Sequence, residues 1–421
     1  MQHYRKIVAV VDGYSTGRYL ASFLHKKGYA ALHIQSSPEI PDFLIKSFNA
    51  IDYIDSTIYN GDLLKLLDWL KSYQVQAIMA GTETAIFFVD ELSELLGLPG
   101  NSSKTSHVRR DKYEMIKCIH EGGLATARQC KSGNISEIVE WGLIEMKRAL
   151  PLVVKPINSA GTDGVQFCYN ESELALSVKN ILGKKNKLGY LNEEVLVQSF
   201  LEGEEYIVNT VTCASKHNLT DIRRCYKKQV LGAGYVSGSE EFISPHEPIA
   251  QELKAYTFKA LDLLNITYGP AHFEIMYTKE GPQIIEMGAR VQGGINPAAN
   301  AICLGYQQID KALDAYLDPS HFNAYYKNDY TLHKFGLWVF LISEMNGKIT
   351  SIPFIEKVKL LPSFFSIQMN VNPGDDLKKT VDYYTSPGHV HLINENNESL
   401  MEDFRKLRQF EAEGFILEKS F

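Results

Sequence analysis

The sequence has little of what marks a disulfide-rich or zinc-binding protein. Only six of its 421 residues are cysteine, and no two of them form a Cys-x-x-Cys pair or another paired spacing. Disulfide scaffolds and structural zinc sites both depend on regularly spaced cysteines. We therefore predict scattered, reduced thiols and a cytoplasmic protein.

Long apolar runs and an excess of positive charge are also missing. The first apolar run, Ile7–Val11, is much shorter than the core of a signal peptide or a membrane span. The net charge of −7 gives no electrostatic case for binding nucleic acid or an anionic membrane. The composition, 45% apolar and 22% charged, is that of a globular protein. A chain of this length is expected to form about two to four domains.

Two common nucleotide-binding fingerprints are absent as well. No G-x-x-x-x-G-K-[ST] or G-x-G-x-x-G string occurs, which excludes a Walker A loop and the usual dinucleotide fingerprint. The sequence has instead the stretch 269–294, in which two alternating runs, 272–277 and 283–289, flank a turn of hairpin composition.

Charged residues lie two positions apart on both strands of this predicted hairpin. Side chains alternate along a strand, so His272 and Glu274 share a face of the first run, and Glu286, Gly288 and Arg290 share a face of the second. Pairing of the strands would set the two carboxylates about 5 Å apart, where they repel unless a cation lies between them. Mg²⁺ suits such a pair, because phosphate and water fill its other positions. The alternative is a solvated hairpin whose charges face water.

A second motif carries the complementary charge. Leu152–Pro156 is typical of an apolar strand and delivers Lys155, and the small residues of 157–164 then lead into a strand predicted at 165–169. Backbone N–H groups of such a loop can surround phosphate oxygens, and the lysine adds a positive charge. Taken alone, a Gly-Thr-Asp-Gly loop is more often a plain turn.

Together, and in this order, the two motifs resemble the ATP-grasp superfamily of carboxylate–amine ligases, and in detail its L-amino acid ligase branch. The resemblance covers most of the chain, through segments 12–17, 99–101, 110–112, 155–164, 202–206 and 286–290. It implies an α/β (α+β) ATP-grasp fold. The implied domains are a preATP-grasp parallel-sheet domain (1–105), an ATP-grasp domain (106–320) with a nucleotide lid (120–205) and a metal-binding subdomain (206–320), and a C-terminal antiparallel-sheet α+β domain (321–421).

The resemblance also implies which residues bind ATP. Lys112 and Lys155 match the two lysines that bind the nucleotide phosphates. The matches to the phosphate loop, the adenine hinge and the ribose-binding carboxylate are Ser159, Gly161, Thr162, Gln198, Ser199, Leu201 and Glu205. Gln198 departs from the glutamate that is usual in the family, although its amide oxygen can still accept a hydrogen bond.

For the metal, the resemblance implies Mg²⁺, with Mn²⁺ as a substitute, held by Glu274 and Glu286. Many relatives have an asparagine ligand where this chain has Gly288. The family mechanism uses two magnesium ions. At position 288, either water takes the place of the asparagine or the second ion has fewer protein ligands.

For the reacting groups, the resemblance implies that Arg290 stabilises an acyl phosphate. His272 either contacts substrate or is a structural histidine. Glu83, Gly293 and Gly294 are candidate substrate contacts, and a plain acid at a helix N-terminus is the alternative for Glu83.

The remaining segments show no catalytic pattern. The basic residues of 223–228 could gather phosphate or a substrate carboxylate, but we predict that they are exposed on a strand and outside the site. A glycine-rich link through Gly232, Gly234 and Gly238 follows. After residue 321 we predict an antiparallel sheet closed by one helix, with strands at 335–342, 348–352, 357–361, 366–371 and 390–393 and a helix at 399–413. This part is assigned to packing, to forming a homodimer, or to covering the active site.

The predicted function is that of an ADP-forming C–N ligase. It would activate a carboxylate, expected to be that of an amino acid, as an acyl phosphate and pass it to an amine, giving an amide or dipeptide. Its partners would be small-molecule carboxylates and amines, without nucleic acid or membrane. Alternatives are bicarbonate activation as in a biotin carboxylase, formate activation in purine synthesis, and a non-catalytic ATP-binding protein, which Gln198 and Gly288 permit.

Overall fold

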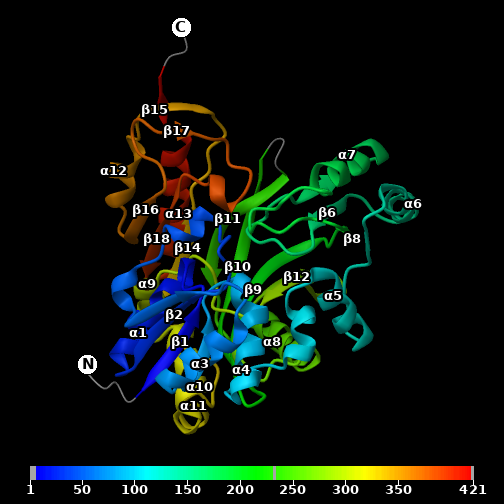
Figure 1. Cartoon of the computed structure of the whole chain (residues 1–421). Coiled ribbons are helices and arrows are strands. Elements are labelled where there is room, and N and C mark those ends of the chain that lie inside the picture. The colour runs from blue at the N-terminus through cyan, green and yellow to red at the C-terminus, as the bar shows by residue number, and fades with distance from the viewer. Residues whose placement is uncertain (1–5, 231–233, 419–421) are drawn as a thin grey trace.

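A computed structural model describes residues 6–230 and 234–418, and in this part of the chain the strands form four sheets. In Figure 1 the N-terminal part lies at the lower left, the last hundred residues at the upper left, and a smaller unit projects at the right. One sheet is parallel and the other three are antiparallel. The predicted mixture of a parallel N-terminal sheet with antiparallel sheets is confirmed.

The inner strands of the parallel sheet are buried on both faces. Its strands are β3 (Asp55–Ile58), β2 (Ala30–Gln35), β1 (Ile7–Val11) and β4 (Ala77–Ala80), in that spatial order. The helices of this part are α1 (Arg18–Lys26), α2 (Asp42–Ile45), α3 (Leu63–Tyr73) and α4 (Ile86–Leu96). Val8 and Val10 of β1 pack towards α1 and α10 (Gln308–Leu317), whereas Ala9 and Val11 pack towards α3 and α4. Helices on both faces explain why β1 is apolar throughout.

The central sheet has eight antiparallel strands in the order β13-β12-β9-β10-β11-β14-β18-β16. Their bounds are β9 Gly203–Cys213, β10 Lys216–Val230, β11 Gly234–Phe242, β12 Tyr268–Thr278, β13 Gly281–Gly288, β14 Phe335–Phe340, β16 Phe364–Met369 and β18 Gly388–Asn394. One face packs on α5 (Lys112–Glu121), α8 (Pro248–Leu263) and α9 (Pro297–Leu304). A further helix, α11 (Pro319–Tyr325), follows α10.

A separate antiparallel unit at residues 129–199 lies at the right of Figure 1. It consists of β5 (Gln129–Ser132), β8 (Val195–Ser199), β6 (Leu152–Pro156) and β7 (Gln166–Cys168), with α6 (Ile135–Met146) and α7 (Glu171–Ile181). Leu152 and Val154 pack into a core with α6 and α7. Because side chains alternate along a strand, Val153 and Lys155 face away from these helices.

The C-terminal strands differ in part from the prediction. β14, β18 and β16 continue the central sheet, and β15 (Gly347–Ser351) pairs with β17 (Asp376–Leu377) and β19 (Ile416–Leu417) in a small sheet. The strand predicted at 357–361 is wrong, because this segment belongs largely to α12 (Phe354–Lys359). Phe354 and Val358, four residues apart, enter the core against α13 (Asn397–Ala412), whereas Leu360 is 84% exposed. The apolar period is that of a helix.

The glycine-rich link is also a correction. Gly234 and Gly238 lie in strand β11, which pairs with β10 and β14, and Gly232 lies outside the described residues. Glycine weakens a strand pattern, so the sequence did not indicate this strand. A bulge between Tyr226 and Lys227 interrupts the pairing of β10 with β11.

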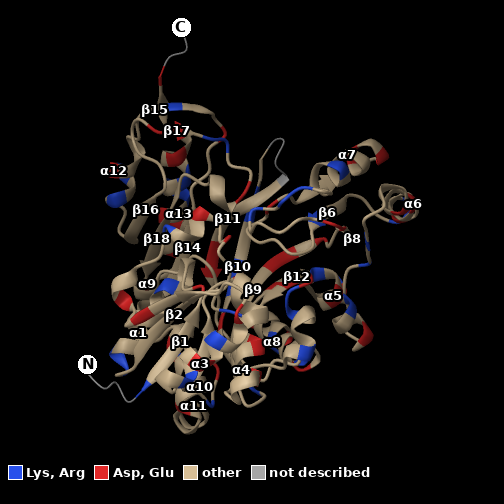
Figure 2. Cartoon of the chain, viewed as in Figure 1, with Lys and Arg blue, Asp and Glu red and all other residues tan. Residues whose placement is uncertain are grey.

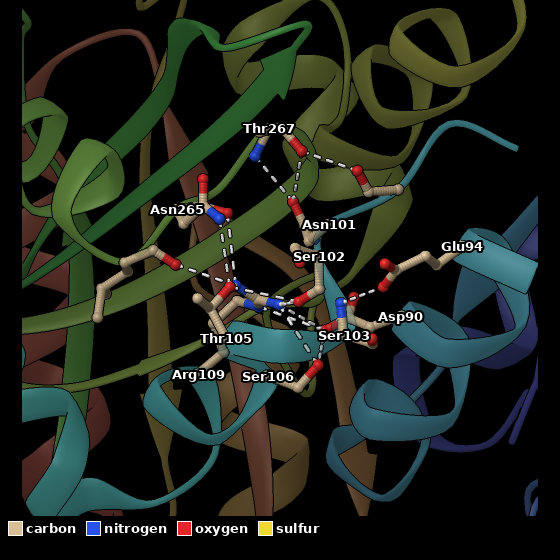
Figure 3. A network of polar contacts seen from close by, with 12 residues as sticks. Asp90, Glu94, Asn101, Ser102, Ser103, Thr105, Ser106, Arg109, Asn265 and Thr267 are labelled. Carbon is tan, nitrogen blue, oxygen red and sulfur yellow. Dashed lines mark hydrogen bonds and ion pairs between the residues drawn. The ribbon is translucent and has the colours of Figure 1, made fainter. Parts of the chain in front are cut away.

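A buried arginine joins the N-terminal part to the central sheet. Arg109, in the 3₁₀ segment Ser103–Arg109, is fully buried, and its Nη2 lies 2.8 Å from Asp90 Oδ2 on α4. Its Nη1 donates to the carbonyl of Leu264, after α8, at 3.0 Å. Figure 3 shows Arg109 at the centre of this network. The contacts fix the segment that carries Arg110 and Lys112 into the next helix.

Acidic and basic residues are interspersed over the elements in view in Figure 2, including the central strands. All six cysteines are free thiols, as predicted. Within residues 6–230 and 234–418, every helix is too short or too polar to cross a membrane.

Candidate active site

One cleft brings together residues from all parts of the chain. Its volume is about 880 Å³, and its lining comes from the 129–199 unit, the central sheet, the N-terminal part and the C-terminal part. Every predicted site residue lines it: Glu83, Lys112, Lys155, Ser159, Gly161, Thr162, Gln198, Ser199, Leu201, Glu205, His272, Glu274, Glu286, Arg290, Gly293 and Gly294. Their individual roles stay predictions.

The two carboxylates of the hairpin lie directly opposite each other. Glu274 on β12 pairs with Glu286 on β13, which confirms the predicted hairpin and its register. The ammonium of Lys112 lies 3.0 Å from Glu286 Oε2 and donates to the carbonyl of Ser159 at 2.5 Å. A cation therefore occupies one side of the pair, as the repulsion between two close carboxylates requires.

The carboxylate pair fits a metal ion that arrives with its own ligands. In the described part of the chain, no group of three or more His, Cys, Asp or Glu side chains could hold a metal. Two carboxylates supply only part of the coordination shell of a divalent cation. The residues thus suit Mg²⁺ carried by nucleotide phosphates and water, and they do not form an all-protein metal cage.

The ring of His272 has a polar neighbour at each of its nitrogens. Its Nδ1 lies 3.0 Å from Asn209 Oδ1, and its Nε2 lies 3.6 Å from Glu274 Oε1. Burial alone would raise the pKa of the Glu274 carboxyl, but His272 and Lys227 outweigh it and hold this pKa below its usual range. His272 therefore helps to keep Glu274 ionised, whether or not it also contacts substrate.

Lys155 points into the cleft from β6, opposite the face that packs on the helices. Burial lowers the pKa of its ammonium to about 8, against the attraction of Glu286. The loop that follows is shaped by Gly161 and Thr162, which have φ angles of 70° and 64°. A Cβ at Gly161 would lie 2.7 Å from the Tyr384 ring, so both conformation and space favour glycine there.

The part of the cleft that is predicted to bind adenine has polar and aromatic neighbours from several strands. Gln198 Nε2 donates to Gln129 Oε1 at 3.1 Å, and Ser199 Oγ accepts from the Arg128 amide at 3.0 Å. Phe200 and Tyr235, which sequence analysis missed, stack with ring centroids 6.4 Å apart and form an apolar wall beside them. Such a flat apolar slot suits a purine ring.

Glu83 lies between two arginines. Its Oε2 accepts from Arg110 Nη1 at 2.9 Å, and its Oε1 lies 2.8 Å from Arg290 Nε. Both oxygens thus face guanidinium groups, which is a different environment from the plain helix N-terminus or open substrate contact considered from the sequence.

The comparisons with known proteins agree with this geometry. The ATP-grasp domain pattern matches residues 148–298. Dapdiamide A synthase of Enterobacter agglomerans is 33% identical over 419 residues, which cover 98% of this chain and 97% of that protein. The chain belongs to the ATP-grasp family. It is an ATP-dependent, ADP-forming carboxylate–amine ligase.

Solved structures share the fold of this ATP-grasp ligase. An L-amino acid ligase from Bacillus licheniformis superposes with a TM-score of 0.76 at 18% identity, covering 99% of this chain and all of that one. Phosphoribosylglycinamide synthetase from Anaerococcus prevotii gives a TM-score of 0.66 at 15% identity over 98% of this chain and all of that one. At such identities the likeness concerns the fold.

Three further cleft residues of the ligase escaped sequence analysis: Cys225, Glu240 and Trp338. The register places them in a row with the predicted Glu205, on the four neighbouring strands β9, β10, β11 and β14. Only the strand order, with β14 next to β11, reveals this row.

The basic residues of 223–228 were also misjudged in part. Lys227 lines the cleft, with its Nζ 2.8 Å from Glu205 Oε1, the carboxylate assigned to the ribose. Arg223 is buried and not exposed, because it pairs with Asp221 at 3.0 Å and with Glu240 at 3.1 Å. The two adjacent basic pairs were visible in the sequence, but which face of β10 is covered was not.

The lowered pKa of Lys155 predicts pH-dependent binding of ATP. Below about pH 8 the ammonium is present in the free enzyme, and the affinity for ATP is at its highest. Above this pH, binding of ATP must take up a proton. The dissociation constant of ATP should then rise by up to about tenfold per pH unit, until the pH reaches the ordinary pKa of lysine. Calorimetry from about pH 7.5 to 9.5, in two buffers of different ionisation enthalpy, measures both effects. Lys155→Arg should flatten the profile. An unchanged affinity across this range in the wild type contradicts the prediction.

Proposed function

We propose that this ligase joins the carboxylate of an amino acid to the amine of a second small molecule, with Mg·ATP as the phosphoryl donor. The observation that carries the proposal is one cleft in which two lysines and a carboxylate pair adjoin a further buried carboxylate, Glu240, one oxygen of which accepts no hydrogen bond from the described residues. The names of two similar proteins support it, since one is a dapdiamide A synthase and the other an L-amino acid ligase.

In the first step Lys112 and Lys155 bind the nucleotide phosphates, while Glu274 and Glu286 hold the metal. Mg²⁺, when bound, supplies charge neutralisation on the transferred phosphoryl group. An oxygen of the substrate carboxylate forms a bond to the γ-phosphorus, the bond to the β-phosphate oxygen breaks, and ADP leaves with its electron pair. Lys112 then has to exchange Glu286 for phosphate, a short movement of a flexible side chain.

In the second step the amine attacks the acyl carbon. Phosphate leaves with the electron pair of the C–O bond, and the amine proton passes to solvent or phosphate. The guanidinium of Arg290 stabilises the negative charge that develops on the tetrahedral adduct, because its planar fork matches phosphate and oxyanion geometry.

Glu240 supports an amino acid as substrate. Its Oε2 accepts hydrogen bonds from Arg223 at 3.1 Å and Gln292 at 2.9 Å, while Oε1 accepts none from the described residues. Burial raises the pKa of this carboxyl despite Arg223. A further cation, such as the ammonium of an amino acid, would therefore stabilise it. Trp338, Phe340 and Tyr383 line the adjoining wall and suit an apolar side chain.

The test is a screen of amino acid pairs for phosphate release with Mg·ATP, followed by mass spectrometry. We expect ADP, phosphate and one amide in equal amounts for the true pair. AMP and pyrophosphate as products, or ATP turnover that depends on bicarbonate or formate without an amine, would refute the proposal and favour another reaction.

A further inference from the structure

Gly288 and Glu83 lie against each other in the site, although they come from distant parts of the chain. Gly288 ends strand β13, two residues after Glu286 and two before Arg290, and Glu83 begins the 3₁₀ segment Glu83–Ala85 after β4. A Cβ at Gly288 would lie 2.2 Å from Glu83 Oε1. Real carbon and oxygen atoms do not approach so closely, so any other residue at position 288 displaces the carboxylate. The φ angle of Gly288 is outside the left-handed region, so the backbone itself would accept alanine.

The space left by the missing side chain is used to hold Arg290. Glu83 Oε1 lies 2.8 Å from Arg290 Nε, and Arg290 Nη1 donates to the carbonyl of Val291 at 3.0 Å. These contacts fix the guanidinium at Nε and Nη1. Its Nη2 donates no hydrogen bond to residues 6–230 or 234–418, and the side chain lines the cleft. The Nε and Nη1 side of the guanidinium therefore faces the protein, and the N–H donors of Nη2 remain available to a ligand.

Glu83 is itself held in place from the other side. Its Oε2 accepts from Arg110 Nη1 at 2.9 Å, and Arg110 follows directly on Arg109, the buried residue that ties its segment to Asp90 (Figure 3). Burial alone would raise the pKa of Glu83, but Arg290 and Arg110 hold it below its usual range. The carboxylate is therefore charged, nearly buried and restrained by two guanidinium groups, as a rigid support needs to be.

We propose that Glu83 is a positioning residue for the ligase reaction: it orients Arg290 from the N-terminal part of the chain, and Gly288 is the residue that leaves room for it. The proposal rests on the role proposed above for Arg290. The alternative is that Glu83 only stabilises the contact between the N-terminal part of the chain and the central sheet. The two readings differ in what Gly288→Ala does to turnover, since alanine at this position removes no ion pair partner.

The test is a double-mutant cycle of Gly288→Ala and Glu83→Ala, with Glu83→Gln as a variant of nearly unchanged size. Each single variant should lower kcat by about ten- to a hundredfold, the scale of a small misplacement of a reacting group, with the KM for ATP within about twofold of wild type. The double variant should be no slower than Glu83→Ala alone, because without the carboxylate there is no clash and Arg290 is already free to move. Glu94→Ala is the matched control: Glu94 accepts from the Ser103 amide at 2.9 Å, outside the cleft, and its loss should leave kcat unchanged.

Melting temperatures of the four proteins give a second, independent readout. Gly288→Ala should lower the melting temperature of the wild type and leave that of Glu83→Ala unchanged. Effects on kcat that multiply in the double variant, or a wild-type kcat in Glu83→Gln and Glu83→Ala, overturn the positioning role. If the wild type releases no phosphate with any acid and amine, the proposed function fails. The melting temperatures still decide whether Gly288 and Glu83 are coupled, and additive shifts overturn that coupling.

Discussion

Glu286→Gln is expected to lose nearly all phosphate release, about a thousandfold, while the protein still folds. The change keeps the shape of the side chain but removes one of two carboxylates that can hold Mg²⁺ next to the transferred phosphoryl group. Several kcal/mol of charge stabilisation in the transition state correspond to a loss of this size. The same variant should lose most of the rise in melting temperature that Mg·ATP gives the wild type.

The ligand-free protein should melt somewhat lower in Glu286→Gln than in the wild type. From the sequence, two close carboxylates would repel, and removing one would relieve strain. The structure shows instead that Lys112 Nζ lies 3.0 Å from Glu286, with the lysine side chain 10% exposed. Taking away this partner leaves a nearly buried ammonium with a single carbonyl contact, at Ser159.

Calorimetric melts with and without Mg·ATP, beside a phosphate assay, measure both effects. Glu280→Gln, an exposed acid in the turn of the same hairpin, is the matched control and should behave as the wild type. Mg²⁺ without nucleotide should raise the melting temperature little, because the protein supplies too few ligands for a free ion. If Glu286→Gln turned over at the wild-type rate, the hairpin would not bind a metal ion, and its acids would simply face solvent.

The parts of the site that could be predicted are those encoded by local patterns. The hairpin of Glu274 and Glu286 follows from a period of two on either side of a turn, and its register was confirmed. Lys155 follows from an apolar strand that is covered on one face only. In both segments the neighbours in the sequence are also the neighbours in space.

The parts that could not be predicted depend on which distant strands lie side by side. Glu240 and Trp338 meet because β14 pairs with β11, almost a hundred residues earlier in the chain. No local pattern encodes that pairing. For the same reason the C-terminal strands were expected to form a sheet of their own, while β14, β18 and β16 extend the central one. The domain boundary placed at 320 stays a prediction.

At two positions the chain departs from the family's usual residue, and the structure gives a physical reason for each. Gly288 looked like a lost metal ligand, and the structure shows that its missing side chain is replaced in space by Glu83, two hundred residues earlier. Gln198, the other departure, donates to Gln129 on the neighbouring strand β5, which a glutamate could not do.

Arg290→Lys is the second change with a large expected effect, and it separates binding from chemistry. We expect kcat to fall by about a hundred- to a thousandfold, the cost of removing a preorganised donor from an oxyanion site. The KM for ATP should change much less, because Lys112 and Lys155 remain. A lysine keeps the positive charge but has a single nitrogen, so it cannot pair with Glu83 through one nitrogen while it presents a separate planar pair of N–H donors to a ligand.

Steady-state kinetics and the melting shift with Mg·ATP distinguish the outcomes for Arg290→Lys. Retained melting shift with lost turnover supports a role in stabilising the acyl phosphate and its adduct. A parallel loss of both would make Arg290 part of the ATP site instead. Glu83→Gln offers the sharpest comparison, because it leaves the arginine present but less firmly held: its kcat should lie between those of the wild type and Arg290→Lys. If Glu83→Gln were slower than Arg290→Lys, the carboxylate would have to act on substrate itself and not through the arginine.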